Sequence, residues 1–397
     1  MTGVVALTAV LCLAQILTML GVFAFPALLP TFFAEWHLSN TEAGWIAGIY
    51  FAGHSIAVPV LSSLTDRIDA RRVYMVGAAL AAVAAAGFAF FAEGFWSAMV
   101  FRLFAGMGLA GTYMPGLRAL TDRCEGPGQT RAVAFYTACF SLATGLSFLM
   151  AGEVGRMFGW RAAFAVAAVA TGLGLILVAV ALSPLKPQQA LVPTRLLDFR
   201  PVLRNRLAMG YILGYAAHIW ELFGFRSWLV VFLVFALSFH DQGGWPSPTT
   251  VATIASLLAV ATSIGGQELA TRFGRRRVVS ALMLASAVAA VGIGFTASLP
   301  YGWVVVLAVA YATLMHADSA ALTTGTVLAA EPGRRGATLA MHSLCGFGAG
   351  FLGPLAIGVV LDLAGGTGSV FAWGLAFASL GVVVALGPLA LFILGRK

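Results

Sequence analysis

Runs of twenty or more apolar residues recur along the whole chain and alternate with short polar connections. A helix of about 20 apolar residues is long enough to cross the hydrocarbon core of a membrane. Only 10% of the 397 residues are charged, whereas a soluble domain carries about a quarter. Because lipid forces a spanning segment to satisfy its own backbone groups, the sequence predicts an all-α integral membrane protein.

The positions of these runs predict twelve transmembrane helices. Their connections are short except for a proline-containing segment at mid-chain. We therefore expect two six-helix bundles, residues 1–184 and 207–397, joined by a cytoplasmic linker at 185–206. The predicted spans are 4–30, 42–64, 73–93, 95–121, 131–153, 161–183, 207–237, 249–270, 278–297, 301–328, 338–361 and 370–394.

The basic residues are distributed unevenly between the two sides of this predicted bundle. Of the 23 Lys and Arg residues, 19 lie in the even-numbered connections or at the C-terminus, and Arg102 and Arg226 lie inside spans. This bias predicts that both termini are cytoplasmic, in a membrane of the bacterial inner-membrane type. The net charge of +8 is then a signal of topology, and nucleic acid is not an expected partner.

Two basic loops indicate an internal duplication. Asp66 in the first loop corresponds to Thr271 in the second, 205 positions later, and a Glu-Gly-Pro-Gly segment at 125 has a Glu-Pro-Gly counterpart at 331, 206 positions later. Repeats at a constant offset within a membrane bundle are typical of transporters. The four cysteines lack metal-ligand spacing, and we expect no metal, no cofactor and no disulfide.

The loop motifs resemble those of the major facilitator superfamily over essentially the whole chain. The family motif G-x-x-x-D-R-x-G-R-R is matched in part, with Ser62 and Asp69 at its two glycine positions, and span 4 matches R-x-x-x-G-x-G from Arg102. The resemblance implies a twelve-helix fold of two pseudo-symmetric halves and a cytoplasmic loop that latches helices by charge pairing. The residues expected to form this conformational gate are Asp66, Arg67, Arg71, Arg72, Arg272 and Arg275.

Ionisable residues inside spans are the best candidates for function, because an ionisable group in lipid is costly unless it faces a wet or paired interior. Glu221 and Asp318 lie near mid-depth of spans 7 and 10. We expect them to carry protons. Subtracting 206 takes Glu221 to Gln15 and Asp318 to Thr112, so all four related positions are polar. The residues expected to bind solute are Gln15, Arg102, Thr112, His218, Arg226 and His316.

Several of these candidates have a structural alternative. Asp318 is also able to form an ion pair with an arginine of another span, and Arg226 is interpreted as its partner or as a snorkelling side chain. His218 is as compatible with a satisfied interior histidine as with a proton relay. His54 and His342 are interpreted as packing residues.

The pattern predicts a monomeric, proton-coupled secondary transporter of a small anionic or polar solute, working by alternating access. The alternative is a proton-driven exporter of amphipathic cations, in which Glu221 and Asp318 hold the substrate charge. The Gly-Pro motif of antiporters is missing from span 5, although span 11 contains a similar run ending at Gly353-Pro354. We expect no enzymatic activity, because none of the motifs sought for hydrolases or nucleotide binding is present.

Overall fold

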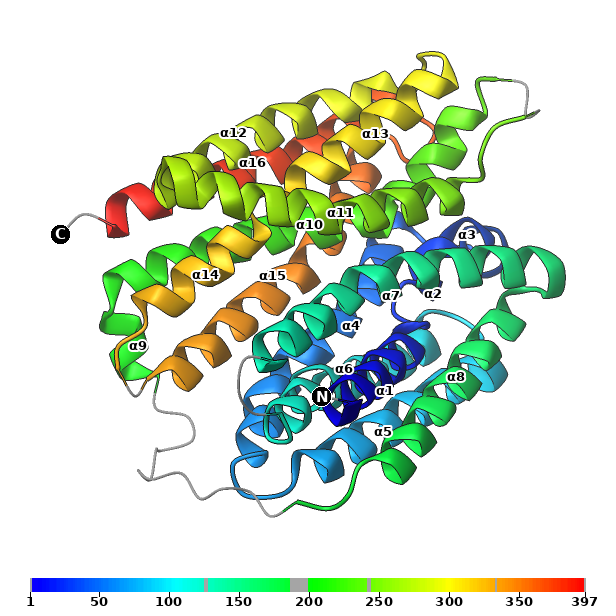
Figure 1. The fold of residues 1–397 in the computed structure, drawn as a ribbon. Helices are drawn as coiled ribbons and strands as arrows, with labels where there is room; N and C mark the ends of the chain where they lie inside the picture. Colours follow the sequence, from blue (N-terminus) through cyan, green and yellow to red (C-terminus); the bar gives the residue numbers. More distant parts are fainter. Residues whose placement is uncertain (1, 125–127, 186–198, 241–243, 333, 396–397) are drawn as a thin grey trace. The chain divides into compact units, whose positions relative to one another are not determined.

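The computed structural model describes residues 2–124, 128–185, 199–240, 244–332 and 334–395, so most of the predicted linker lies outside the described residues. Helices connected by turns and short loops form the whole of this part, and it contains no strand. Figure 1 shows the helices in chain order. They are α1 (Thr2–Met19), α2 (Ala24–Ala27), α3 (Leu29–Trp36), α4 (Asn40–Leu64), α5 (Ala70–Phe91), α6 (Phe95–Thr121), α7 (Gly128–Phe158), α8 (Trp160–Ala181), α9 (Arg200–Arg204), α10 (Arg206–Leu237), α11 (Pro248–Phe273), α12 (Arg275–Ile293), η1 (Gly294–Thr296), α13 (Tyr301–His316), α14 (Ser319–Ala329), α15 (Arg335–Ala364) and α16 (Val370–Leu394).

Ten helical segments among the described residues are long and apolar enough to cross a membrane. They correspond to ten of the twelve predicted spans, with α13 and α14 together forming one segment, Tyr301–Ala329. The first and fourth predicted spans correspond to the shorter apolar helix α1 and to α6, which contains Arg102 and Arg118. The all-α membrane fold is therefore confirmed, and the count of twelve spans stays a prediction.

The chain divides into two compact units that differ from the two predicted bundles. One unit contains Met1–Leu28 and Ala52–Leu197, and the other contains Leu29–Phe51 and Asp198–Lys397. Residues 29–51, which include α3 and the first half of α4, thus pack with the second unit. The two halves of α4 belong to different units.

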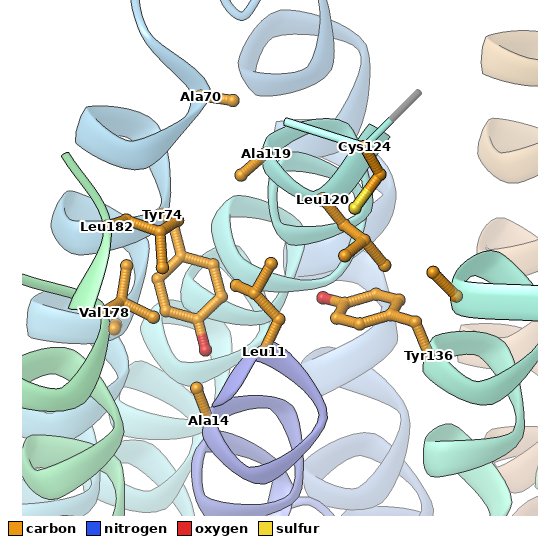
Figure 2. Close-up of a cluster of buried hydrophobic side chains, with 12 residues drawn as sticks. Leu11, Ala14, Ala70, Tyr74, Ala119, Leu120, Cys124, Tyr136, Val178 and Leu182 are labelled. Carbon is orange, nitrogen blue, oxygen red and sulfur yellow. The ribbon is translucent and has the colours of Figure 1, made fainter. Parts of the chain in front are cut away.

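In the first unit, α1 packs against α6, α7 and α8, and α5 packs against α6 and α8. Figure 2 shows the buried cluster where these helices meet, in which Tyr74 and Tyr136 lie on either side of Leu11. The glycines of span 4 allow the close helix approach expected of small residues in membrane helices. A Cβ on Gly77 of α5 would lie 2.6 Å from the Cα of Gly111 in α6, so neither helix leaves room for a side chain there.

In the second unit, α10 is the central helix, with α13, α14, α15 and α16 among its neighbours. In its most apolar stretch of 18 residues, 83% are buried, the largest share among the ten candidate spans. A helix buried on all sides needs apolar residues on all its faces. The polar residues His218, Glu221 and Arg226 of α10 are all buried. The fold therefore places these three residues of α10 in the core of the second unit.

Two predicted spans are broken within the membrane-spanning region. The first ends as α1 at Met19 and continues as α2 and α3 after a turn at residues 20–23. The tenth, predicted as one helix, ends as α13 at His316 and resumes as α14 at Ser319 (Figure 1). Broken helices within a bundle expose backbone groups that side chains must satisfy.

Candidate functional site

The break in the tenth span places Asp318 between α13 and α14. Asp318 is the N-cap residue of α14, yet its side chain makes no capping hydrogen bond. Its Oδ1 lies 2.8 Å from Nδ1 of His218 on α10, and both side chains are almost fully buried. Gly266 of α11 lies against the carbonyl group of Ala317, where a Cβ would clash. The break thus aims the carboxyl group of Asp318 at α10 rather than along its own helix.

Glu221 lies one helical turn after His218 and has two hydroxyl partners. Ser286 Oγ on α12 donates to Glu221 Oε1 at 2.7 Å, and Tyr311 OH on α13 donates to the same oxygen at 2.9 Å. Glu221 is 0% exposed, and Oε2 has no hydrogen-bond partner among the described residues. Both partners are neutral, so the carboxyl group is able to gain or lose a proton without breaking an ion pair.

Arg226 lies further along α10 and contacts His316. Its Nη2 lies 2.7 Å from Nε2 of His316, and Nδ1 of His316 lies 2.5 Å from the carbonyl oxygen of Ala312. Because a carbonyl oxygen only accepts, Nδ1 carries the hydrogen and Nε2 of the neutral ring accepts from the guanidinium. Arg226 thus contacts the last residue of α13, and its interpretation as the partner of Asp318 stays a prediction.

A stacked pair of rings adjoins this cluster. His342 of α15 stacks on Tyr215 of α10 with ring centroids 3.7 Å apart, and the same tyrosine ring lies 5.9 Å from His218. Thr326 Oγ1 lies 3.2 Å from Nδ1 of His342. His342, interpreted as a packing residue, thus packs as expected and also has a polar partner.

In the first unit, the positions that the predicted repeat relates to this cluster hold uncharged side chains. Tyr136 OH donates to Gln15 Oε1 at 2.7 Å and also lies 3.3 Å from the backbone carbonyl of Thr112. Adding 206 to Tyr136 gives His342, just as it takes Gln15 to Glu221 and Thr112 to Asp318. The related positions of span 1, span 4 and span 5 therefore meet within this unit at a buried phenol.

Arg102 is placed at the break in the first span. It is buried, and its Nη1 lies 3.1 Å from the carbonyl of Val22. Ser147 of α7 satisfies the same turn, accepting from the N–H of Phe23 at 3.0 Å and donating to the carbonyl of Leu20 at 2.6 Å. These contacts give Arg102 a structural task, and its expected role in solute binding stays a prediction.

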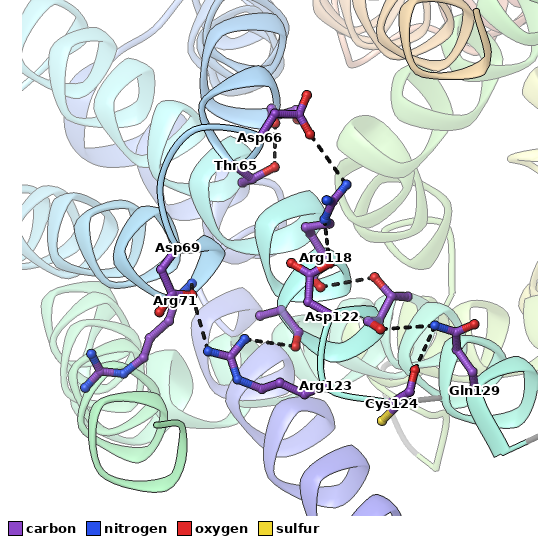
Figure 3. Close-up of polar contacts among 12 residues, drawn as sticks. Thr65, Asp66, Asp69, Arg71, Arg118, Asp122, Arg123, Cys124 and Gln129 are labelled. Atoms are coloured by element: carbon purple, nitrogen blue, oxygen red, sulfur yellow. Dashed lines mark hydrogen bonds and ion pairs between the residues drawn. The ribbon is translucent and has the colours of Figure 1, made fainter. Parts of the chain in front are cut away.

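The first basic loop forms a network of charged side chains (Figure 3). Asp66 pairs with Arg118 of α6 at 3.5 Å, not with the adjacent Arg67. Arg118 also pairs with Asp122 of the same helix end at 2.7 Å. The charge pairing implied by the family motif is therefore present, but its basic partner comes from the end of span 4.

Asp69, at the second glycine position of the motif, connects three helix ends. It accepts from the N–H of Leu185 at 2.8 Å and of Arg71 at 3.0 Å, and from Arg123 Nη2 at 3.3 Å. Burial alone would raise the pKa of this carboxyl group, but these donors outweigh it and lower the pKa below its ordinary value of 3.8. The ionised carboxylate of Asp69 thus connects the start of α5 to the segment that follows α8.

The remaining predicted gate residues have different surroundings within their own units. Arg71 Nη2 donates to the carbonyl of Ala179 in α8 at 2.7 Å. Arg272 pairs with Glu268 one turn earlier in α11 at 2.8 Å. Arg67 and Arg72 are exposed, and Arg275 is half-buried at the start of α12. Their joint role as a conformational gate stays a prediction.

Sequence reasoning missed the hydroxyl groups that hold the buried site. Ser286, Tyr311 and Tyr136 were not singled out, although each bonds to a predicted site residue. Tyr136 had a detectable signal, because it is the counterpart of His342 at the repeat offset. Ser286 and Tyr311 had none, since the offset takes them to Leu80 and Ala105.

Several known proteins share the sequence pattern or the fold of this chain. A family model described as Major Facilitator Superfamily matches residues 11–315. The probable sphingolipid transporter spinster homolog 1 of Arabidopsis thaliana is 27% identical over 143 residues, which are 36% of this chain and 29% of that protein. The niacin transporter NiaP of Acinetobacter baylyi is 26% identical over 144 residues, 36% of this chain and 32% of NiaP. The chain thus aligns with about a third of the length of these curated relatives.

Solved structures match over almost the whole chain. A bacterial homolog of the human lysosomal transporter Spinster has a TM-score of 0.75 at 17% identity, covering 98% of this chain and 96% of that one. The nucleoside transporter NupG has a TM-score of 0.75 at 14% identity, covering 98% of this chain and 100% of that one. At these identities the likeness concerns the fold.

Proposed function

Because this chain belongs to the major facilitator superfamily, we propose that it is a secondary active transporter driven by protons and specific for a small polar or anionic solute. In this proposal α1 and α6 complete a set of twelve spans, and the bundles 1–184 and 207–397 alternate in access to the solute. The distribution of Lys and Arg supports this proposal with both termini on the cytoplasmic side of a membrane of the bacterial inner-membrane type.

The observation that carries the proton coupling is the environment of Glu221. It is fully buried in the central helix of the second unit and is held by two neutral hydroxyls at 2.7 and 2.9 Å. An ionisable residue kept in such a place is a functional candidate by default, because a neutral side chain would pack there at lower cost. We assign the transported proton to Glu221, with no cofactor or metal involved.

The pair of His218 and Asp318 supplies a second exchangeable group near the first. Its 2.8 Å contact joins α10 to the break between α13 and α14. A proton arriving on this pair changes the attraction that holds the broken helix against α10. In the proposed cycle, protonation of the pair therefore changes the position of α14 relative to α10.

Arg226 and His316 support a solute with a negative charge or polar groups. The guanidinium is buried at 4% exposure and is oriented by the neutral ring of His316. An arginine fixed in this way has a defined orientation, and the planar guanidinium group suits a carboxylate. NiaP, a relative by sequence, is named for transport of niacin, a small carboxylic acid.

One observation favours the alternative, an exporter of amphipathic cations. Glu221 has no cationic partner at hydrogen-bond distance among the described residues, so a substrate amine is able to take that place. Two relatives are named for sphingolipid transport. Under this reading the carboxyl group of Glu221 binds the substrate charge directly, and neutralising it abolishes binding as well as coupling.

A thermal-shift screen followed by flux measurements separates the two readings. Purified protein is heated with nicotinate as a small carboxylate, with phosphate as an inorganic anion, and with tetraphenylphosphonium as a hydrophobic cation. We expect nicotinate or another small carboxylate to raise the melting temperature. The stabilising compound, radiolabelled, should then accumulate in proteoliposomes against its gradient and leak out when a protonophore is added.

Glu221→Gln tests the coupling residue in the same vesicles. The variant should retain solute exchange and lose accumulation driven by the proton gradient, because the amide keeps the shape but carries no proton. Glu93→Gln, at an exposed position between α5 and α6, is the matched control and should transport like the wild type. Stabilisation by tetraphenylphosphonium alone would contradict the anionic solute, and proton-driven accumulation by Glu221→Gln would contradict the assigned coupling residue.

A further inference from the structure

The N-terminus of α4 has two separate sets of hydrogen bonds. Within its own segment, Ser39 N–H and Oγ both donate to Glu42 Oε2, at 2.8 and 3.0 Å, and Glu42 N–H returns a bond to Ser39 Oγ at 3.2 Å. This is a reciprocal capping box, which is sufficient to start a helix. The second set of bonds is therefore not needed to begin α4.

The second set comes from a carboxylate near the far end of α15. Asp362 Oδ1 accepts from the backbone N–H of Asn40 at 3.1 Å and from its Nδ2 at 2.8 Å. Asp362 Oδ2 accepts from the backbone N–H of Thr41 at 2.7 Å and from its Oγ1 at 2.6 Å. One anion thus receives four hydrogen bonds at a helix N-terminus, the end of a helix dipole that favours negative charge.

Below this contact, α4 and α15 approach each other through small residues. A Cβ on Gly44 would lie 2.7 Å from the carbonyl oxygen of Pro354, and Cβ atoms on Gly48 and Gly358 would clash with the opposing backbone. Phe51 ends the contact by stacking on Phe223 of α10, with ring centroids 3.9 Å apart. The first half of α4 therefore fits the second unit along its whole length.

We propose that Asp362 is a releasable latch that holds the first half of α4 on α15. This inference rests on the proposed alternating-access function. The contact lies at the end of the spans that the basic-residue pattern places away from the cytoplasm, and the second half of α4 belongs to the other unit. Opening that end during transport must separate α4 from α15, and the four bonds of Asp362 set how often it does.

The latch is exposed, which suits a contact that breaks and re-forms. Asp362 lies in an exposed position, so water replaces the donors of Asn40 and Thr41 when the helices part. Because solvent screens the attraction between exposed charges, this contact depends mainly on its four directed hydrogen bonds. Asp362→Asn replaces one acceptor oxygen by a donor group and therefore loses the two bonds made at that oxygen.

Distance measurements by double electron–electron resonance test the latch. Spin labels are attached at Ala34→Cys on α3 and Leu363→Cys on α15, both exposed positions, in full-length protein whose four native cysteines are replaced by serine. In lipid nanodiscs the unsubstituted latch should give one dominant short distance. Asp362→Asn should increase the population at longer distance severalfold, and Thr41→Val, which removes one of the four donors, should increase it less.

Glu42→Gln is the matched control, because it weakens the capping box on the same helix end without touching α15. It should leave the distance distribution unchanged. A distribution for Asp362→Asn identical to that of the unsubstituted protein would overturn the latch, and so would an equal change in Glu42→Gln. If the latch variants behave as expected but the unsubstituted protein shows no proton-driven accumulation, the proposed function fails while the latch stands.

Discussion

At the scale of single residues, neutral side chains contact two of the buried ionisable groups. Glu221 is bonded to two hydroxyls, and Arg226 to an imidazole that a backbone carbonyl orients. The burial of Glu221 and Asp318 was predictable, because an acid in the middle of an apolar run must enter the bundle interior. Their partners were not, since serine and tyrosine are common in membrane helices and their contacts depend on how the helices pack.

Tyr311→Phe is expected to lower the free energy of unfolding by about 1 kcal/mol, because it removes one of two donors from a buried acceptor. The change is measured as a lower melting temperature in detergent. Tyr301→Phe, on the same helix α13, is the control, since the buried hydroxyl of Tyr301 bonds to no other described residue. Equal losses in both variants would contradict the proposed hydroxyl support of Glu221.

Asp69 predicts a pH-dependent difference in stability. Its pKa is lowered in the folded protein by backbone donors and Arg123, so its contribution is complete above the ordinary value of 3.8 and is lost as the pH falls through the lowered value. The melting temperature of Asp69→Asn should therefore lie below that of the wild type near neutral pH, and the gap should narrow in strong acid. A gap that stays constant across this range would show that the charge of Asp69 is not the cause.

At the scale of elements, the helix breaks differ most from the sequence prediction. The segment from Tyr311 to Ser319 contains neither proline nor glycine, so nothing local predicted an end at His316. The causes are tertiary, because α11 approaches Ala317 closely and Asp318 turns to His218 on α10. In the first span, the partners of the turn come from Arg102 and Ser147, which are distant in sequence.

The glycine pair of α11 provides a test of this close approach. Gly266→Ala should destabilise the protein by about 1–3 kcal/mol, because a methyl group has no room against Ala317 and overpacking forces the backbone to shift. Gly265→Ala is the neighbouring control, since nothing lies within 4 Å of a Cβ at that position. Thermal unfolding measures both, and a Gly266→Ala variant as stable as Gly265→Ala would show that the helices separate easily.

At the scale of the whole molecule, composition and charge distribution were enough to predict an all-α membrane protein, and the loop motifs were enough to predict its superfamily. The division into packed units was not predictable in the same way. Residues 29–51 belong to the first predicted bundle by sequence, yet they pack with the second unit through contacts such as that of Phe51 with Phe223. The repeat is read from the order of residues in the chain. The packed units depend instead on contacts between residues that are distant in sequence.

The predicted topology has a direct test. Green fluorescent protein fused after Lys397 should fluoresce in bacterial cells, and alkaline phosphatase inserted at Gly366 should be active, because these sites are expected on opposite sides of the membrane. Insertion of the phosphatase at Gly274, between α11 and α12, provides a cytoplasmic control and should give no activity. An active phosphatase at Gly274 would contradict the predicted orientation.

The amide of Gln15 at the position related to Glu221 has a consequence for energy conversion. In the proposed transporter only the second half has buried acids at these positions. Gln15 and Thr112 are neutral, whereas their counterparts Glu221 and Asp318 are acids. The number of protons moved per solute then cannot exceed the number of protonatable groups in the second half. This ratio of protons to solute sets the largest solute gradient that the transporter maintains at a given proton-motive force. Gln15→Glu is the substitution that would raise the ratio.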